Sequence, residues 1–227
     1  MVVERFCGGD PLKVVGITVL LYFPAMYTVT GALFYLTREA AERKLDRGDL
    51  PGAEKLLRLA LTFMTPFHSE DTRAVLETLV GCTLSARGRT APAGYEFESA
   101  LEAIEGTRQR AAQMLGKDPI MLESVQTKVD QTFAGAEAVA SLELAAIMSR
   151  DGRRSQAAAH CHTAIRSLQE YRACLVRNMS VEEVQNRKSD REHRWALLLG
   201  LPASERLALI DRCLADAHGI ADEVREV

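Results

Sequence analysis

The uncharged run from Val14 to Leu36 constrains this chain more than any other feature. An α-helix rises about 1.5 Å per residue, so the run spans about 35 Å as a helix, and the apolar core of a bilayer is about 30 Å thick. A secretory signal would have a shorter apolar region and a small-residue cleavage site. A buried core helix is the alternative, although such runs are usually shorter. The sequence therefore predicts a short N-terminal segment over residues 1–13 and a transmembrane helix over residues 14–36.

Lysine and arginine are more frequent after this run than before it. Two precede it, Arg5 and Lys13. Four follow within a short distance: Arg38, Arg43, Lys44 and Arg47. The positive-inside rule therefore places the rest of the chain on the positive side of the membrane. That side is the cytoplasm of a bacterium or the matrix of a mitochondrion.

The composition is that of a chain with a packed domain. Hydrophobic residues make up 47% and charged residues 26%, which excludes a disordered chain. The formal net charge of −3 is too balanced to indicate nucleic acid binding. The cysteines have no CxxC spacing, so we expect them to be reduced and mostly buried. They are Cys7, Cys82, Cys161, Cys174 and Cys213.

Start and stop signals divide the rest of the chain into helices. No stretch alternates with period two for long enough to indicate a strand. Asp49 is expected to cap one helix, and Ser180 with Glu183 forms a capping box for another. The expected helices cover residues 38–48, 49–64, 69–87, 92–116, 119–150, 155–177, 180–199 and 204–218. The sequence therefore predicts an all-α fold.

Three helix pairs share one pattern of small and large residues. A glycine separates the partners in each pair: Gly48, Gly88 and Gly152. Alanine occupies the fifth and the twelfth position after each glycine, a larger residue occupies the ninth, and a small residue lies at the seventh position before it. For Gly48 these positions are Ala53, Ala60, Leu57 and Ala41. For Gly88 they are Ala93, Ala100, Phe97 and Gly81, and for Gly152 they are Ala157, Ala164, Cys161 and Ala145. Antiparallel helices approach closely only where small side chains occupy the crossing.

This pattern is typical of tetratricopeptide repeats. It predicts about three tetratricopeptide-like helix pairs over residues 37–178 and capping helices over residues 179–227. A generic helical bundle with alanine-rich seams is the alternative. In the repeat register, Gly81 faces Ala93 or Phe97 of the next helix. We then expect Gly81→Leu to overpack the seam and Gly81→Ala to be close to neutral.

No motif predicts a reaction or a metal site. His160, Cys161 and His162 are consecutive on an expected helix, so their side chains fan out over about 200° instead of converging on zinc. There is no HExxH, phosphate-binding glycine loop or G-x-S-x-G. Trp195 is expected to be a packing anchor. We therefore expect no enzymatic activity, cofactor or metal.

The stretch 93–97 (AGYEF), followed by Ala-Leu-Glu at 100–102, resembles a known family. It is similar to the mitochondrial inner-membrane tetratricopeptide proteins associated with respiratory complex III, the tetratricopeptide repeat domain protein nineteen family. A repeat like residues 53–61 (AEKLLRLAL) and an SQA element like residues 155–157 extend the resemblance. The later repeats of the family are missing or degenerate after Arg177. The resemblance implies an accessory or assembly subunit of complex III without catalytic residues.

An anchored adaptor that binds peptides or proteins in the groove of its repeats is the alternative function. The positions expected to face that groove are Arg38, Glu42, Thr78, Cys82, Leu142 and Ala146. In both cases the expected partners are other proteins, such as subunits of a membrane complex, and the lipid bilayer through residues 14–36. Nucleic acid is not an expected partner.

Overall fold

The computed structural model describes residues 11–64, 70–115, 119–185 and 187–225. Within these ranges, side chains are described from residue 26 onward, except at 70–71 and 114–132. Every regular element in the described part of the chain is helical, as predicted.

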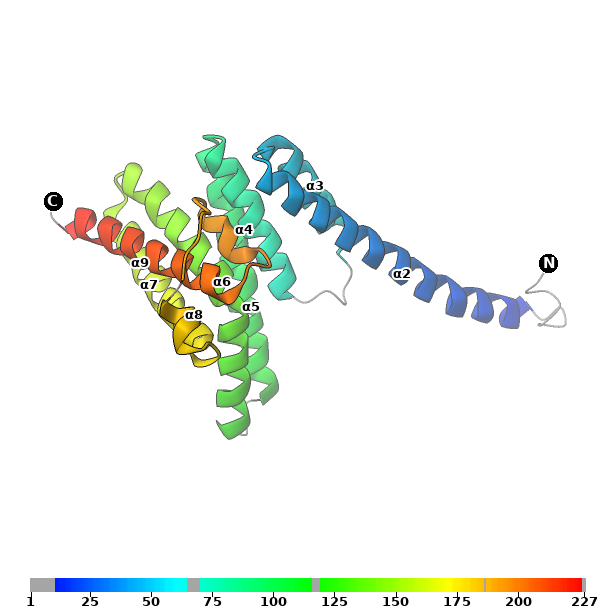
Figure 1. The fold of residues 1–227 in the computed structure, drawn as a ribbon. Helices are drawn as coiled ribbons and strands as arrows, with labels where there is room; N and C mark the ends of the chain where they lie inside the picture. Colours follow the sequence, from blue (N-terminus) through cyan, green and yellow to red (C-terminus); the bar gives the residue numbers. More distant parts are fainter. Residues whose placement is uncertain (1–10, 65–69, 116–118, 186, 226–227) are drawn as a thin grey trace.

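The helices form three consecutive hairpins followed by a C-terminal group (Figure 1). The hairpins are α2 (Pro11–Asp46) with α3 (Leu50–Phe63), α4 (Glu70–Ala86) with α5 (Thr90–Leu115), and α6 (Pro119–Arg150) with α7 (Arg154–Arg177). The C-terminal group is α8 (Val181–Gln185), the 3₁₀ helix η1 (Arg194–Leu198) and α9 (Ala203–Arg225). The helix order up to Arg177 agrees with the sequence prediction.

One type of turn closes all three hairpins. Gly48, Gly88 and Gly152 have φ angles of 72°, 73° and 74°, in the left-handed region that glycine adopts readily. Each glycine amide donates to the carbonyl three residues earlier, and the next amide donates to the carbonyl five residues earlier, at 2.8–3.0 Å. These two bonds define the Schellman motif. The alignment on the three glycines is therefore confirmed by their backbone geometry.

Every seam position of the predicted register is buried. The side chains with 0% exposure are Ala41, Ala53, Leu57, Ala60, Ala93, Phe97, Ala100, Ala145, Ala157, Cys161 and Ala164. The helices α4 and α5 approach closely at Gly81, where an added Cβ atom would lie only 2.5 Å from Cε1 of Phe97. The prediction that Gly81 faces Phe97 is confirmed, and the ring of Phe97 occupies the space that a side chain on Gly81 would need.

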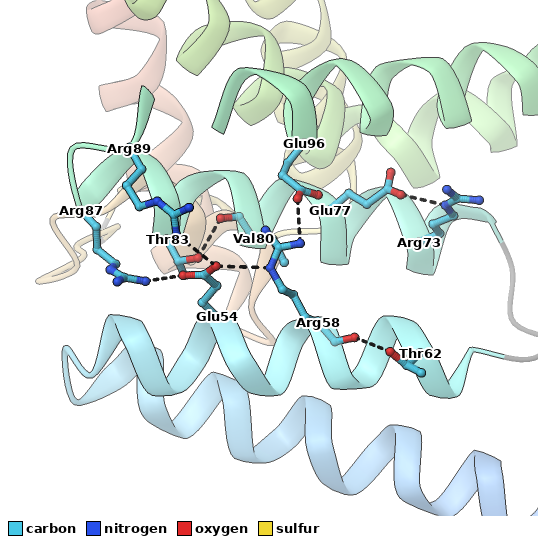
Figure 2. Close-up of polar contacts among 10 residues, drawn as sticks. All are labelled: Glu54, Arg58, Thr62, Arg73, Glu77, Val80, Thr83, Arg87, Arg89 and Glu96. Carbon is cyan, nitrogen blue, oxygen red and sulfur yellow. Dashed lines mark hydrogen bonds and ion pairs between the residues drawn. The ribbon is translucent and has the colours of Figure 1, made fainter. Parts of the chain in front are cut away.

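A carboxylate on α3 ties the first hairpin to the second (Figure 2). Glu54 binds Arg87 and lies 3.3 Å from Nε of Arg58 and 3.7 Å from Nη1 of Arg89. Arg58 also lies 3.0 Å from Glu96 on α5. Because the Glu54 side chain is only 12% exposed, these pairs are screened less than ordinary surface pairs.

A second carboxylate, Glu137 on α6, joins three helices. It accepts hydrogen bonds from Arg108 on α5 at 2.5 and 2.9 Å, and from the buried Ser167 hydroxyl on α7 at 2.6 Å. Burial alone would raise the pKa of Glu137. The hydrogen bonds from Arg108 and Ser167 and the charges of Arg108 and Arg166 outweigh it and lower that pKa from its ordinary value of 4.5.

The prediction of one helix over residues 180–199 is wrong after Gln185. Ser180 and Glu183 form the predicted capping box, with the Ser180 amide donating to Oε2 of Glu183 at 2.8 Å. Yet α8 ends at Gln185, and residues 187–193 lie outside helices. No apolar residue occurs between Val184 and Trp195. A helix there would have no apolar face to pack on the body, and an unpacked short helix is unstable in water.

The last helix is longer than the one expected over residues 204–218. α9 continues through Gly219 to Arg225. Ile220 and Val224 pack against the main core cluster. This packing outweighs the cost of a glycine inside a helix, which is about 1 kcal/mol relative to alanine.

The N-terminal part of α2 projects from the body as a single straight arm (Figure 1). Phe34 is buried, but large apolar residues around it are exposed. They are Met26, Tyr27, Val29, Leu33, Tyr35 and Leu36. Among the residues whose side chains are described, no helix is long and apolar enough to cross a membrane. Residues 14–25, the first half of the predicted span, lie outside that part of the chain.

Gly81→Ala should destabilise the protein, contrary to the near-neutral effect expected from the sequence. Because the added Cβ would lie 2.5 Å from the Phe97 ring, we expect overpacking near the upper end of its usual range, about 2–3 kcal/mol, and the propensity gain of about 1 kcal/mol leaves a net loss of about 1–2 kcal/mol. Gly94→Ala on α5 is the matched control, because a Cβ there meets nothing within 4 Å and should stabilise. Denaturant titration of the full chain in detergent micelles measures both variants. An unchanged midpoint for Gly81→Ala would contradict the described seam.

Glu137→Gln should lower the free energy of unfolding at pH 7 by about 2–3 kcal/mol, because it removes a buried charge partner of Arg108. The folded-state pKa of Glu137 lies below 4.5, so its ionised form stabilises the fold fully above that value. The stabilisation that ionised Glu137 provides disappears as the pH falls through its folded-state pKa. A series of denaturant titrations from pH 7 to progressively lower pH should therefore show the difference in stability between variant and parent shrinking below pH 4.5. A difference that stays constant with pH would argue against an ionised Glu137.

Candidate functional site

The C-terminal part of the chain covers a face formed by the first helices of the hairpins. α4 and α6 contact one another, and η1 contacts both of them. α9 packs along α7 and touches α6 (Figure 1). We call residues 187–199 the covering segment and the surface of α4, α6 and the α2–α3 turn beneath it the covered face. In a helical repeat this is the side on which a peptide partner is expected.

One stripe of α4 side chains meets the covering segment. Val75 lines a cavity of about 290 Å³ together with Leu197, Leu198 and Leu199. Cys82 lies two turns further along α4. Burial raises the pKa of its thiol, and the charge of the nearby Arg194 guanidinium opposes that rise. Ser85 donates to Glu143 of α6 at 3.4 Å. Because these α4 positions recur at helical spacing, they lie on one side of the helix.

Three arginines hold the covering segment by ion pairs, and the first of them, Arg187, lies 2.7 Å from Asp211 on α9. Arg194 reaches Glu143 on α6 at 3.1 Å and Asp216 on α9 at 3.0 Å. Burial alone would lower the pKa of Arg194, but Glu143 and Asp216 outweigh it and raise that pKa above its ordinary value. Arg191 pairs with Asp46 at the end of α2, so the segment extends to the first hairpin.

The backbone of the covering segment is bound by α9 instead of by its own helix. Arg212 donates to the carbonyl of Arg191 at 2.7 Å and to the carbonyl of Ser189 at 3.1 Å. These bonds satisfy oxygens that would otherwise need intrahelical partners. They favour the non-helical path of residues 187–193, which sequence reasoning did not predict.

Apolar side chains of η1, together with Leu199 directly after it, complete the contact. Trp195, Ala196, Leu197 and Leu199 are each at most 8% exposed and belong to the same core cluster as Cys82. Trp195 is thus a packing anchor, as predicted. His193 stacks on its indole ring, with centroids 3.9 Å apart and planes at 15°. A cavity of about 410 Å³ remains between the covering segment and the turn at residues 45–48.

The predicted groove positions do not form an open groove. Thr78, Cys82 and Leu142 are at most 3% exposed. Arg38 and Glu42 are half-buried and form an ion pair at 3.0 Å on α2, and Ala146 is half-buried. The correction has a physical reason: the C-terminal residues were expected to cap the end of the array, but they lie across its face. Sequence reasoning missed Asp46, Glu143, Arg191 and Arg194, whose pairing depends on the tertiary fold.

Two buried thiols are held in the protonated form by their surroundings. Burial and the nearby Glu143 raise the pKa of Cys82 well above its ordinary value. Burial likewise raises the pKa of Cys213 to about 12. Both are therefore neutral near pH 7, whereas a nucleophilic cysteine needs a lowered pKa. Cys82, Cys161 and Cys213 are free and buried and Cys174 is half-buried, as expected, while Cys7 lies outside the described residues.

The described side chains include no group of three or more histidine, cysteine, aspartate or glutamate residues placed to hold a metal ion. His160 is half-buried, Cys161 is buried and His162 is exposed, so the three neighbours diverge around α7.

Comparisons with known proteins do not identify the chain. A scan against protein-family models and searches of curated proteins and of solved structures each found no match.

The single tryptophan should report on the covering segment. Trp195 is 8% exposed, so its fluorescence should be blue-shifted and poorly quenched by iodide in the full chain. Complete unfolding should shift the emission to the red and increase quenching several-fold. Emission and quenching like those of free indole in the native protein would show that η1 does not pack on α4 and α6.

Proposed function

We propose that this protein is a non-catalytic, membrane-anchored scaffold built from tetratricopeptide-like hairpins. In this proposal it is an accessory or assembly subunit of a mitochondrial respiratory complex, with complex III favoured by the resemblance of residues 93–102. The N-terminal half of α2 crosses the inner membrane, and the hairpins lie in the matrix.

The main observation in favour of a membrane anchor is the distribution of exposed apolar residues around α2. Successive helical residues advance by about 100°, so Met26, Tyr27, Tyr35 and Leu36 point in four directions about a quarter-turn apart. Each of them is at least 37% exposed. A surface helix of a water-soluble domain has one apolar stripe and one polar face. An apolar helix without a polar face suits lipid.

The boundary of the proposed anchor coincides with a change in side-chain chemistry. Thr37 donates to the carbonyl of Leu33 at 2.7 Å, which hides its hydroxyl from an apolar medium. From residue 38 onward the helix carries charges, and Arg38 pairs with Glu42 one turn later. Charged side chains at the end of a span belong at the membrane–water interface.

Two observations support a scaffold over an open peptide receptor. The face used by peptide-binding repeats is covered by residues 187–199. Tyr95, in the GYEF element of the resemblance, is 76% exposed on α5 and is available to a partner on another side of the domain. The adaptor hypothesis keeps one supporting observation, the partial exposure of Arg38, Glu42 and Ala146.

Val29→Asp should weaken membrane insertion, because a carboxylate within an apolar span costs about 2.5–3.5 kcal/mol near its centre. Leu59→Asp on α3 is the matched control, since Leu59 is exposed to a similar degree but belongs to the body. The full chain and Leu59→Asp should float with phospholipid vesicles and resist alkaline extraction, and Val29→Asp should be extracted. Equal extraction of all three proteins would refute the anchor.

The assignment to a complex is tested separately. Gentle solubilisation of mitochondrial inner membranes and separation by size should place the protein with complex III. The domain should resist protease until the inner membrane is opened. Migration as a free monomer would exclude the scaffold, and digestion after rupture of the outer membrane alone would exclude the matrix location.

A further inference from the structure

We propose that the covered face is a protein-binding site whose partner must displace the covering segment. The partner is an extended peptide with the chemistry of residues 191–197: two arginines three residues apart, a large aromatic residue directly after the second arginine, and a leucine two residues further on. The inference concerns the hairpins alone and holds whether or not α2 enters a membrane.

The covering segment contacts the rest of the protein through the kinds of interaction that hold a bound peptide. Its residues 187–193 lie outside helices, and the carbonyls of Ser189 and Arg191 accept hydrogen bonds from Arg212 on α9. Its charges pair with Asp46 and Glu143 of the hairpins, and its indole is buried against the core. Side-chain anchors of this kind are the usual determinants of peptide affinity.

The covering segment is held at both ends, by the Arg187–Asp211 pair at 2.7 Å and by the buried Leu199, but exposed residues flank it. On the N-terminal side, α8 contains no buried residue. On the C-terminal side, Gly200 and Pro202 are exposed, and a Cβ on Gly200 would meet nothing within 4 Å. Because the flanking residues are exposed and no seam position lies within residues 187–199, the segment can open without disturbing the seams of the hairpins, as expected of a local unfolding unit.

The charges of the covered face select the partner. Asp46 at the end of α2 and Glu143 on α6 offer two separate carboxylates, of which the Glu143 side chain is the less exposed, at 17% against 43%. An acidic peptide would be repelled, and a wholly apolar one would leave both carboxylates unpaired when it excluded water. A peptide with two arginines and an aromatic residue satisfies both requirements.

A tethered segment competes strongly with any free peptide. A short tether gives an effective concentration in the millimolar range. A free peptide of equal intrinsic affinity therefore does not displace the parent segment at micromolar concentration. The test must first weaken the segment and then supply the peptide.

Two buried cysteines provide the measurement. Cys82 lies beneath the covering segment near Arg194, whereas Cys161 is buried in a hairpin seam on α7. Alkylation of the full chain in detergent micelles by a water-soluble maleimide, followed by peptide mass spectrometry, gives a rate for each thiol. We expect Cys82 to react at least tenfold faster than Cys161, because opening of the segment precedes global unfolding.

Arg194→Gln should accelerate the labelling of Cys82 by about ten- to a hundredfold and leave Cys161 unchanged. A synthetic peptide with the sequence of residues 187–201 should then slow the labelling of Cys82 again. The same peptide carrying Trp195→Ala should have no effect. Arg177→Gln, at the exposed end of α7, is the matched control and should label as the parent does.

Two outcomes would overturn the proposal. Equal rates for Cys82 and Cys161 in the parent and in Arg194→Gln would show that the covering segment opens only with global unfolding. Failure of the peptide to protect Cys82 in Arg194→Gln would show that the face does not bind such a partner. Neither result bears on membrane insertion, which vesicle flotation measures independently.

Discussion

The close approach of paired helices is the constraint on which the rest of the structure depends. Three hairpins are closed by the same glycine turn, and each seam is lined by small residues followed by one larger residue. At Gly81 this approach leaves no room for a methyl group beside Phe97. Because the seams leave so little free volume, each hairpin is a rigid unit, and the charged contacts between hairpins act between fixed surfaces. Glu54 joins the first hairpin to the second, and Glu137 joins α5, α6 and α7.

The seams and turns could be predicted from the sequence because their determinants are local. A glycine, the two alanines that follow it in the pattern and the larger residue between them lie within one hairpin. The same holds for the capping interactions of Asp49 and Ser180, which the structure confirms. The register followed from three repetitions of one pattern, and the helix boundaries up to Arg177 followed from turn residues. A sequence pattern carries no distances, so the space that the Phe97 ring occupies beside Gly81 could not be predicted.

The covered face could not be predicted because its determinants are far apart in the chain. Arg191 and Asp46 are 145 residues apart, and Arg194 and Glu143 are 51 apart. A run of polar residues before Trp195 was consistent with an exposed helix until the positions of the carboxylates were known. For the same reason, the predicted groove residues Thr78 and Cys82 were placed on the correct side of α4 but were expected to be accessible. Periodicity identifies the face of a helix, and only the tertiary fold shows what covers it.

The uninterrupted course of α2 has a mechanical consequence. Its N-terminal arm and the first helix of the repeat array are one 36-residue helix with no linker between them. At about 1.5 Å per residue this is a lever of about 54 Å. A domain without a flexible linker cannot rotate freely about its attachment point. An environment that fixes the arm therefore also fixes the distance and the orientation of the hairpins relative to that environment. Torque on the arm is transmitted through the seam of α2 with α3 and through the arginines around Glu54, so mechanical stress concentrates at that junction.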